Sequence, residues 1–169
     1  MKTIKHISLA LVLAVTTILS SCSSDSSGGG GSAAAGTIKA KAGSTNFTSL
    51  TQASYASMQG GMLVIQGSDA TGKAIQLVIA GATEAGTYTI SDDNAISVVG
   101  SYTEVNLGTF DSTTWAAPYE NSGSVGTITI SEITATAVKG TFNFTGKNQE
   151  GTDTKAVTNG SFNVNFQGN

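Results

Sequence analysis

The titratable side chains set the limits of any catalysis by this chain. Its 169 residues include one histidine, His6, one cysteine, Cys22, and no arginine. His6 lies in an amino-terminal stretch that we expect to be cleaved off, so no imidazole remains to activate a serine or cysteine nucleophile. Zinc sites built from His and Cys are excluded by the same inventory. We therefore predict a protein that is not an enzyme and that carries no cofactor.

Paired carboxylates are the remaining route to hydrolysis, because two of them at suitable spacing can cleave a glycosidic bond. Seven acidic residues could supply such a pair: Glu84, Asp92, Asp93, Glu104, Asp111, Glu120 and Glu132. Most of them stand beside Gly, Asn or Ser in expected turns, where a solvated carboxylate is the other interpretation. A glycan hydrolase based on Asp and Glu is therefore kept as an alternative function.

Two segments carry oxygen ligands that calcium accepts. Asp92 and Asp93 form one group, and Asn148, Glu150 and Asp153 form the other. Neither group has the ligand spacing of an EF-hand loop. We treat these residues as weak metal candidates and predict no metal site.

The segment Gly67–Ala74 nearly matches a phosphate-binding loop. Such a loop needs a Ser or Thr where this chain has Ala74, and a helix should follow it. The residues after Lys73 alternate as a strand instead. We therefore predict a hairpin turn from Ser68 to Lys73 and no nucleotide binding.

The stretch from Asp111 to Gly123 is the least periodic part of the domain and contains the only tryptophan, Trp115, with Tyr119 nearby. Aromatic side chains on a loop can stack on sugars or anchor an interface. The alternative is that Trp115 packs over the end of the fold. We name Trp115 and Tyr119 as candidate ligand-binding residues.

The amino terminus has the pattern of an export signal. Lys2 and Lys5 precede an uncharged, largely apolar run from Ile7 to Leu19, as in a signal peptide. This run is well short of the roughly 20 residues that cross a bilayer as a helix. The sequence Leu19-Ser20-Ser21-Cys22 resembles the lipobox of bacterial lipoproteins, so we expect cleavage after residue 21 and acyl chains on Cys22 that hold the protein to a membrane.

Residues 22–35 are rich in Ser, Gly and Ala, a composition typical of a flexible tether with a random-coil reach of roughly 20 Å. The remaining residues, 36–169, form one predicted domain. Without Lys2 and Lys5 the chain has six lysines against eleven acidic residues, a net charge of −5. The lysines are scattered and arginine is absent, so we predict no nucleic-acid binding.

Any of these groups must be positioned by strands, because apolar residues alternate with polar ones from Thr37 onward. The residues expected to face the core are Ile75, Leu77, Ile79, Ile96, Val98, Tyr102, Ile128, Ile130, Val138, Phe142, Phe144, Phe162, Val164 and Phe166, and those expected to face outward include Gln76, Lys139, Thr141, Asn143, Ser161 and Asn163. About nine such runs predict an antiparallel β-sandwich, with a small up-and-down β-barrel as the alternative.

The last two runs predict an antiparallel hairpin. Asn159-Gly160 is ordinarily a hairpin turn, but a turn there would leave a very short preceding strand. We therefore predict a bulge at Gly160 and place the loop at Gly146–Thr154.

Short motifs along the chain resemble those of small β-rich lipoproteins of unknown function that are abundant in the Bacteroidota. They are the lipobox with its tether, Ala85–Ile90, Gly126–Ile130, and the terminal pair Gly140–Thr145 and Val157–Val164. The resemblance implies an all-β domain on the outer membrane and brings no catalytic residues. Relatives exported to the surface often have several acidic residues after the cysteine, whereas only Asp25 follows here, so surface-facing and periplasm-facing orientations both stay open.

Taken together, the sequence predicts an outer-membrane lipoprotein whose β domain is a binding or accessory module. The expected partners are the membrane, through lipid on Cys22, and a glycan or an envelope protein. The glycan hydrolase and a structural or adhesive envelope protein are the alternatives.

Overall fold

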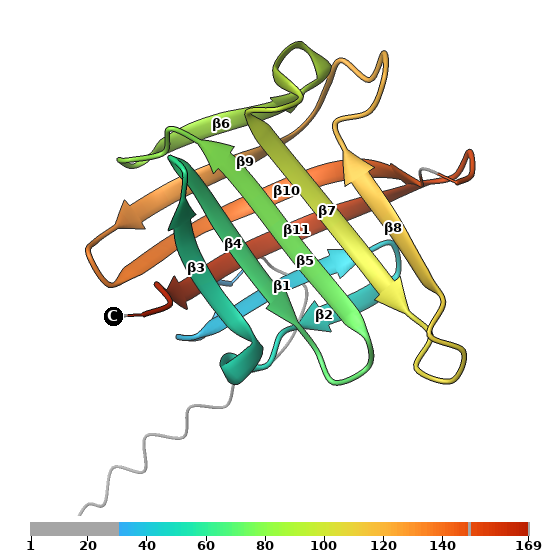
Figure 1. Ribbon diagram of the computed structural model, residues 1–169, viewed down its shortest axis with the longest axis horizontal. Coiled ribbons are helices and arrows are strands. Elements are labelled where there is room, and N and C mark those ends of the chain that lie inside the picture. The colour runs from blue at the N-terminus through green and yellow to red at the C-terminus, as the bar shows by residue number, and fades with distance from the viewer. Residues whose placement is uncertain (1–30, 149, 169) are drawn as a thin grey trace, which may run out of the picture.

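Figure 1 presents a computed structural model of the chain, which describes residues 31–148 and 150–168. The predicted signal peptide, Cys22 and residues 22–30 of the predicted tether lie outside the described residues. Within them, no helix has the length and apolar character needed to cross a membrane.

The described residues form an all-β domain, which confirms the predicted fold class. Its elements are β1 (Thr37–Ala42), β2 (Thr45–Thr48), the 3-10 helix η1 (Thr51–Ala53), β3 (Ser54–Gln59), β4 (Met62–Ser68), β5 (Lys73–Ala80), β6 (Gly86–Ser91), the 3-10 helix η2 (Asp92–Asn94), β7 (Val98–Val105), β8 (Ser112–Ala117), β9 (Ser124–Ile133), β10 (Ala137–Asn148) and β11 (Thr154–Asn165). These described strands number eleven rather than nine, because β2 and β8 are also present. Both carry too few large apolar residues for a clear alternation.

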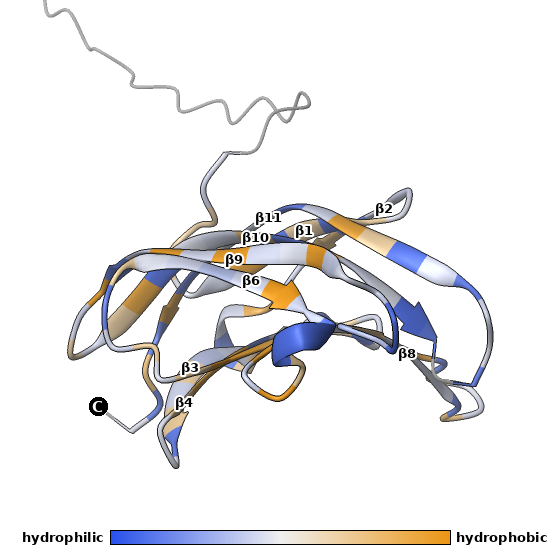
Figure 2. Cartoon of the chain, turned by 90° about the horizontal axis from the view of Figure 1, so that it is seen from above, coloured by the Kyte–Doolittle hydropathy of each residue, from blue (hydrophilic) through white to orange (hydrophobic). Residues whose placement is uncertain are grey.

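The strands form one antiparallel sheet that curls over itself into two layers. The front layer is β3-β4-β5-β7-β8, and the rear layer contains β2-β1-β11-β10 with β9 and β6 beyond β10. Strand β10 joins the layers, because its residues Val138–Phe144 pair with β9 while Lys147 and Asn148 pair with β8. The strands of the two layers cross at a steep angle in Figure 1, and Figure 2 shows the layers one above the other.

The core lies between the layers and is built from the inward positions of both. Its largest fully buried side chains include Tyr102 and Phe47 toward one end and Leu77, Ile128 and Phe162 elsewhere. Burial of this apolar surface is the dominant stabilising term for such a domain.

One predicted side-chain direction is wrong, and one residue that points outward as predicted is covered. Ile96 is 86% exposed, because β7 begins only at Val98 and Ile96 lies in the loop before it. Ser161 points outward but is buried, since the amino-terminal segment lies over it and its hydroxyl donates to the carbonyl of Gly31 at 3.5 Å. Residues 31–35 of the predicted tether therefore pack on the rear layer.

The predicted β10–β11 hairpin is confirmed, with cross-strand pairs from Ala137 and Asn165 to Lys147 and Thr154. Its register shifts between Phe142 and Phe144, where Asn159 has a φ of 52°. A Cβ on Gly160 would lie 2.5 Å from the carbonyl oxygen of Phe142, so only glycine allows this approach. The bulge at Gly160 is therefore where the sequence placed it.

The carboxyl end of β11 leads into the contact that closes the sheet against β3. The amide of Phe166 donates to the carbonyl of Thr136 at 2.9 Å, and the amide of Gln167 donates to that of Ala56 at 2.8 Å. Phe166 is thereby held between the β9–β10 turn and the free edge of β3. The β10–β11 hairpin thus has two ends, with Phe166 at one and Lys155 at the other.

Candidate functional site

One end of the hairpin is closed by a group of aromatic and charged side chains. This closed end consists of Tyr102, Glu104, Trp115, Asp153 and Lys155. The rings of Tyr102 and Trp115 stack with centroids 6.0 Å apart, and the ammonium of Lys155 lies 3.4 Å from the centroid of the Trp115 ring. Lys155 and Tyr102 both donate to Oε1 of Glu104 at 2.9 Å. Each charge is thereby neutralised or hydrogen-bonded.

The strands dictate this arrangement. Tyr102 and Trp115 are direct cross-strand partners on β7 and β8, and Lys155, the second residue of β11, pairs with Gly146. A Cβ on Gly146 would come within 2.7 Å of the backbone carbonyl of Trp115. Glycine at position 146 therefore lets β8 approach β10 closely enough for Trp115 to reach Lys155.

The electrostatics of the closed end favour ionised carboxylates. Burial opposes ionisation of Glu104, but hydrogen bonds from Lys155 and Tyr102 outweigh it and hold the pKa of this carboxyl below its ordinary 4.5. A hydrogen bond of 2.8 Å from the indole of Trp115 lowers the pKa of Asp153. Burial and the nearby Glu104 raise the pKa of Tyr102 well above 10.0. The closed end is thus a set of fixed charges rather than a proton-transfer pair.

The two candidate ligand-binding residues lie in different surroundings. Trp115 is only 6% exposed and belongs to β8, which corrects the expectation that it lies on a loop. Tyr119 lies in the turn after β8, half-buried, with the ammonium of Lys147 5.8 Å from its ring centroid. The ring faces of Trp115 are therefore occupied by protein, while Tyr119 keeps part of its surface accessible.

The weak metal candidates are engaged in local hydrogen bonds. Asp92 and Asp93 begin η2, where the side chain of Ser91 caps the turn. Asn148 Oδ1 accepts from the amide of Glu150 at 3.0 Å, and Asp153 accepts from Trp115. In the part of the chain that the structure describes, no three His, Cys, Asp or Glu side chains form a group that could hold a metal ion.

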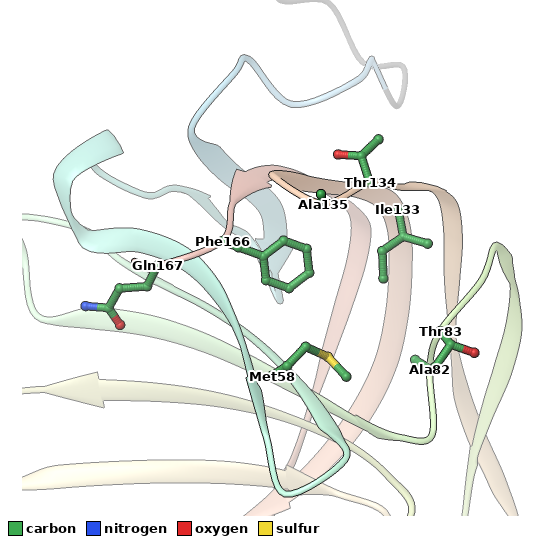
Figure 3. A pocket seen from close by; sticks show the side chains of 8 residues that line it. All are labelled: Met58, Ala82, Thr83, Ile133, Thr134, Ala135, Phe166 and Gln167. Carbon is green, nitrogen blue, oxygen red and sulfur yellow. The ribbon is translucent and has the colours of Figure 1, made fainter. Parts of the chain in front are cut away.

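The other end of the hairpin is open. A hollow of about 580 Å³ lies there between the layers, and we call it the open-end hollow. Its lining residues are Met58, Ala82, Thr83, Ile133, Thr134, Ala135, Phe166 and Gln167. In Figure 3 the side chains of Met58, Ile133 and Phe166 point toward a common space, whereas the amide of Gln167 points away from it.

Four separate segments build this hollow. Met58 comes from the end of β3, Ala82 and Thr83 from the β5–β6 loop, Ile133 and Thr134 from the β9–β10 turn, and Phe166 from the residue after β11. Met58 is 47% exposed, although it has the inward parity of the buried Ala56. Its side chain thus points into the space between the layers, beyond the last buried residue of β3.

Sequence reasoning missed the open-end hollow. The sequence did contain a signal for it. Met58 and Phe166 are apolar and lie two residues beyond the last buried inward residue of their strands, so both are expected to point inward. Apolar side chains at such strand ends are either covered by a loop or line an open hollow. The sequence alone does not distinguish these outcomes.

A second, polar depression of about 340 Å³ lies on the outer side of the front layer, lined in part by Gln66, Gln76, Ser101 and Thr103. The amide of Gln66 donates to the hydroxyl of Tyr55 at 2.5 Å, and that of Gln76 donates to Gln66 at 3.3 Å. These side chains bond to one another along the row. The depression is therefore a self-satisfied polar surface.

Comparison with known proteins gives one match. The sequence model of a family described as a domain of unknown function, DUF6252, matches residues 34–164. The match begins in the segment that covers Ser161 and ends in the last strand, so it spans both layers and both ends of the hairpin. No curated protein and no solved structure matches the chain.

Proposed function

The chain belongs to the DUF6252 family of domains of unknown function, and on this premise we propose that it is a ligand-binding lipoprotein of the outer membrane. Acyl chains on Cys22 hold it to the membrane, and the open-end hollow binds a small, neutral molecule. The open-end hollow is the observation that carries the proposal, because it is an uncharged space of ligand size in a domain whose other end is filled.

The anchoring part rests on the sequence. Lys2 and Lys5, the apolar run and the small residues before Cys22 form a lipoprotein signal. Two or more acyl chains on the mature amino terminus give stable attachment, whereas a single chain binds only marginally. Incorporation of labelled palmitate into the wild type, lost in Cys22→Ala, is the expected result. Labelling that persists in the variant would contradict acylation at this residue.

The size and lining of the hollow define the ligand class. Its volume of about 580 Å³ lies within the roughly 300–1,000 Å³ of typical small-molecule sites. The lining residues carry no charge, and polar and apolar atoms contribute about equally to the lining surface. A charged ligand would lose hydration without gaining a charged partner. A neutral molecule with both apolar and hydrogen-bonding groups therefore fits best.

The carboxyl groups favour binding over glycan hydrolysis. A general acid at neutral pH needs a raised pKa, whereas the pKa values of Asp69, Glu104 and Asp153 are all lowered. For Asp69, burial opposes ionisation but hydrogen bonds from Lys73 and Thr71 outweigh it. Glu132 forms an exposed ion pair of 2.9 Å with Lys139. These environments suit structural charges.

A pair of fluorescent probes that share one skeleton tests the ligand class. N-phenyl-1-naphthylamine is neutral, and 8-anilinonaphthalene-1-sulfonate adds one negative charge. The neutral probe should bind with enhanced fluorescence and at least tenfold more tightly, because the hollow offers no cation for the sulfonate. Equal or tighter binding of the sulfonate would overturn the neutral-ligand proposal.

Two methionine variants locate the binding. Met58 lines the hollow and Met62 does not, yet their exposures are similar at 47% and 40%. Met58→Glu should weaken the neutral probe about tenfold or more by placing a charge in the hollow. Met62→Glu should leave its affinity within about twofold and serves as the matched control. Equal losses in both variants would place the probe elsewhere.

A further inference from the structure

Charge is divided unevenly among the described residues. Eight acidic residues lie outside the strands, whereas every described lysine lies in a strand; the eight are Asp69, Glu84, Asp92, Asp93, Asp111, Glu120, Glu150 and Asp153. The strands of the rear layer contain five of the six described lysines and a single acidic residue, Glu132. A chain that is acidic as a whole therefore has one layer whose strands are basic.

Four of these lysines point outward from the rear layer. Lys39 lies between the buried Ile38 and Ala40, and Lys41, Lys139 and Lys147 likewise follow the outward parity of their strands. We call this surface the lysine face. The fifth, Lys155, is turned toward Trp115 at the closed end.

Most of the lysine face has no acidic counterpart. The salt bridges among the described residues involve Lys73, Lys139 and Lys155. Within that part of the chain, Lys39, Lys41 and Lys147 therefore lack a carboxylate within ion-pair distance. Their charges are available to an external anionic surface.

The outward side chains on the far side of β10 from the β1 lysines are short and polar. Thr87 and Thr129 share a hydrogen bond of 3.1 Å, and the amide of Asn143 donates to Thr127 at 3.0 Å. These pairs lie on β6, β9 and β10, beside the lysine face, whereas residues 31–35 pack over β11, between β1 and β10. The polar surface of β6, β9 and β10 can approach anionic headgroups without burying unpaired polar atoms.

The chain also enters the domain at this face. The carbonyl of Gly31 accepts from Ser161, and the amide of Gly36 donates to Asn163 at 2.7 Å, both on β11. Figure 2 shows the first described residues on the outer side of the rear layer. Eight residues separate Gly31 from Cys22, and the nine residue steps between them correspond to roughly 30 Å when fully extended and about 17 Å as a random coil.

We propose that the lysine face docks on the anionic headgroups of the membrane that holds Cys22. This inference rests on the proposed lipid anchor, which would keep the face within the short reach of the connecting residues. Each lysine near an anionic leaflet strengthens binding about fivefold, an effect that decays within a Debye length of about 8 Å at physiological salt. In this orientation the front layer faces away from the lipid and the open-end hollow opens along the membrane plane.

Vesicle binding of the chain from Ser23 to Asn169, which lacks the acylated cysteine, tests the face alone. The described core lies entirely within residues 33–166, so this chain retains the whole domain. Its net charge is −5, and a uniformly distributed charge of this sign would be repelled by anionic lipid. We expect sedimentation with vesicles of phosphatidylcholine and phosphatidylglycerol in equal parts, little with phosphatidylcholine alone, and release at high salt.

Two substitutions that each add one negative charge distinguish the effect of the lysine face from the effect of net charge. Thr141→Glu places an acid in the centre of the lysine face, and Gln76→Glu places one on the outer side of the front layer; both positions are exposed. Thr141→Glu should weaken vesicle binding about fivefold and Gln76→Glu less than twofold. The triple variant Lys39→Gln/Lys41→Gln/Lys139→Gln should lose at least tenfold.

Three outcomes would overturn the proposal. They are equal binding to both vesicle types, equal losses in Thr141→Glu and Gln76→Glu, and binding only to an acidic polysaccharide such as alginate. Palmitate labelling tests Cys22, and probe binding tests the open-end hollow, so neither measurement depends on the lysine face. Failure of the proposed anchor or ligand is thereby distinguishable from failure of the lysine face.

Discussion

The two ends of the β10–β11 hairpin are built from the same strands but finished differently. At the closed end, the core continues into Tyr102 and Trp115 on β7 and β8, and these rings and Glu104 meet Lys155. At the open end, Met58 and Phe166 point inward but surround a hollow of about 580 Å³. The fold fills the space between the layers at one end and leaves it unfilled at the other, and this difference is the basis of the proposed binding site.

The difference also concerns charge. Polar atoms at the closed end are paired, since Glu104 accepts two hydrogen bonds and the indole of Trp115 donates to Asp153. The lining of the open end has no charged side chain to pair. Charges held by fixed partners add specificity to packing, whereas the uncharged lining of the open end is what the proposed neutral ligand requires.

The largest expected effect is the loss of the closed end in Trp115→Ala. Removing a buried aromatic side chain leaves a cavity and costs about 3–5 kcal/mol of unfolding free energy, and this side chain is 6% exposed. Urea unfolding measures the change. Binding of N-phenyl-1-naphthylamine should stay within about twofold once the folded fraction is corrected for. If the variant kept its stability but no longer bound the probe, the closed end rather than the open end would be the binding site.

A smaller, pH-dependent effect is expected for Glu104→Gln. The folded-state pKa of Glu104 lies below 4.5, so its stabilising contribution is fully present above that pH and is lost as pH falls through the folded-state value. Because the side chain is 37% exposed, we expect less than about 1 kcal/mol at neutral pH. Urea unfolding from neutral pH down to about pH 3 should show wild type and variant converging. A difference that grows on acidification would contradict this assignment.

Much of the fold could be predicted because alternation is local. The inward positions of β5, β9 and β10 are the expected ones, including Leu77, Ile128 and Phe144. The bulge at Gly160 was also predictable, since moving the turn to Asn159-Gly160 would shorten the preceding strand. The outward direction of Ser161 was predictable but its burial was not, because residues far earlier in the chain cover it and alternation within a strand contains no information on such contacts.

The sites divide in the same way. Cys22 was identified from adjacent residues alone, and its acylation stays a prediction. Trp115 was correctly singled out as unusual but was placed on a loop, because β8 has mainly Thr and Ala around it. Tyr119 was named with it, yet the two rings have different partners. The residues of the open-end hollow were not anticipated at all.

The sequence by itself determined the strand class, the terminal hairpin with its bulge, and the absence of arginine and of a second cysteine. Only the tertiary structure decided that one sheet curls into two layers, that lysines from β1 and β10 gather on one face, and that Met58 and Phe166 border the same space. The physical reason is the sequence separation of the residues involved. Strand periodicity is set by neighbouring residues, whereas a face or a hollow depends on which distant strands pair and where each one ends.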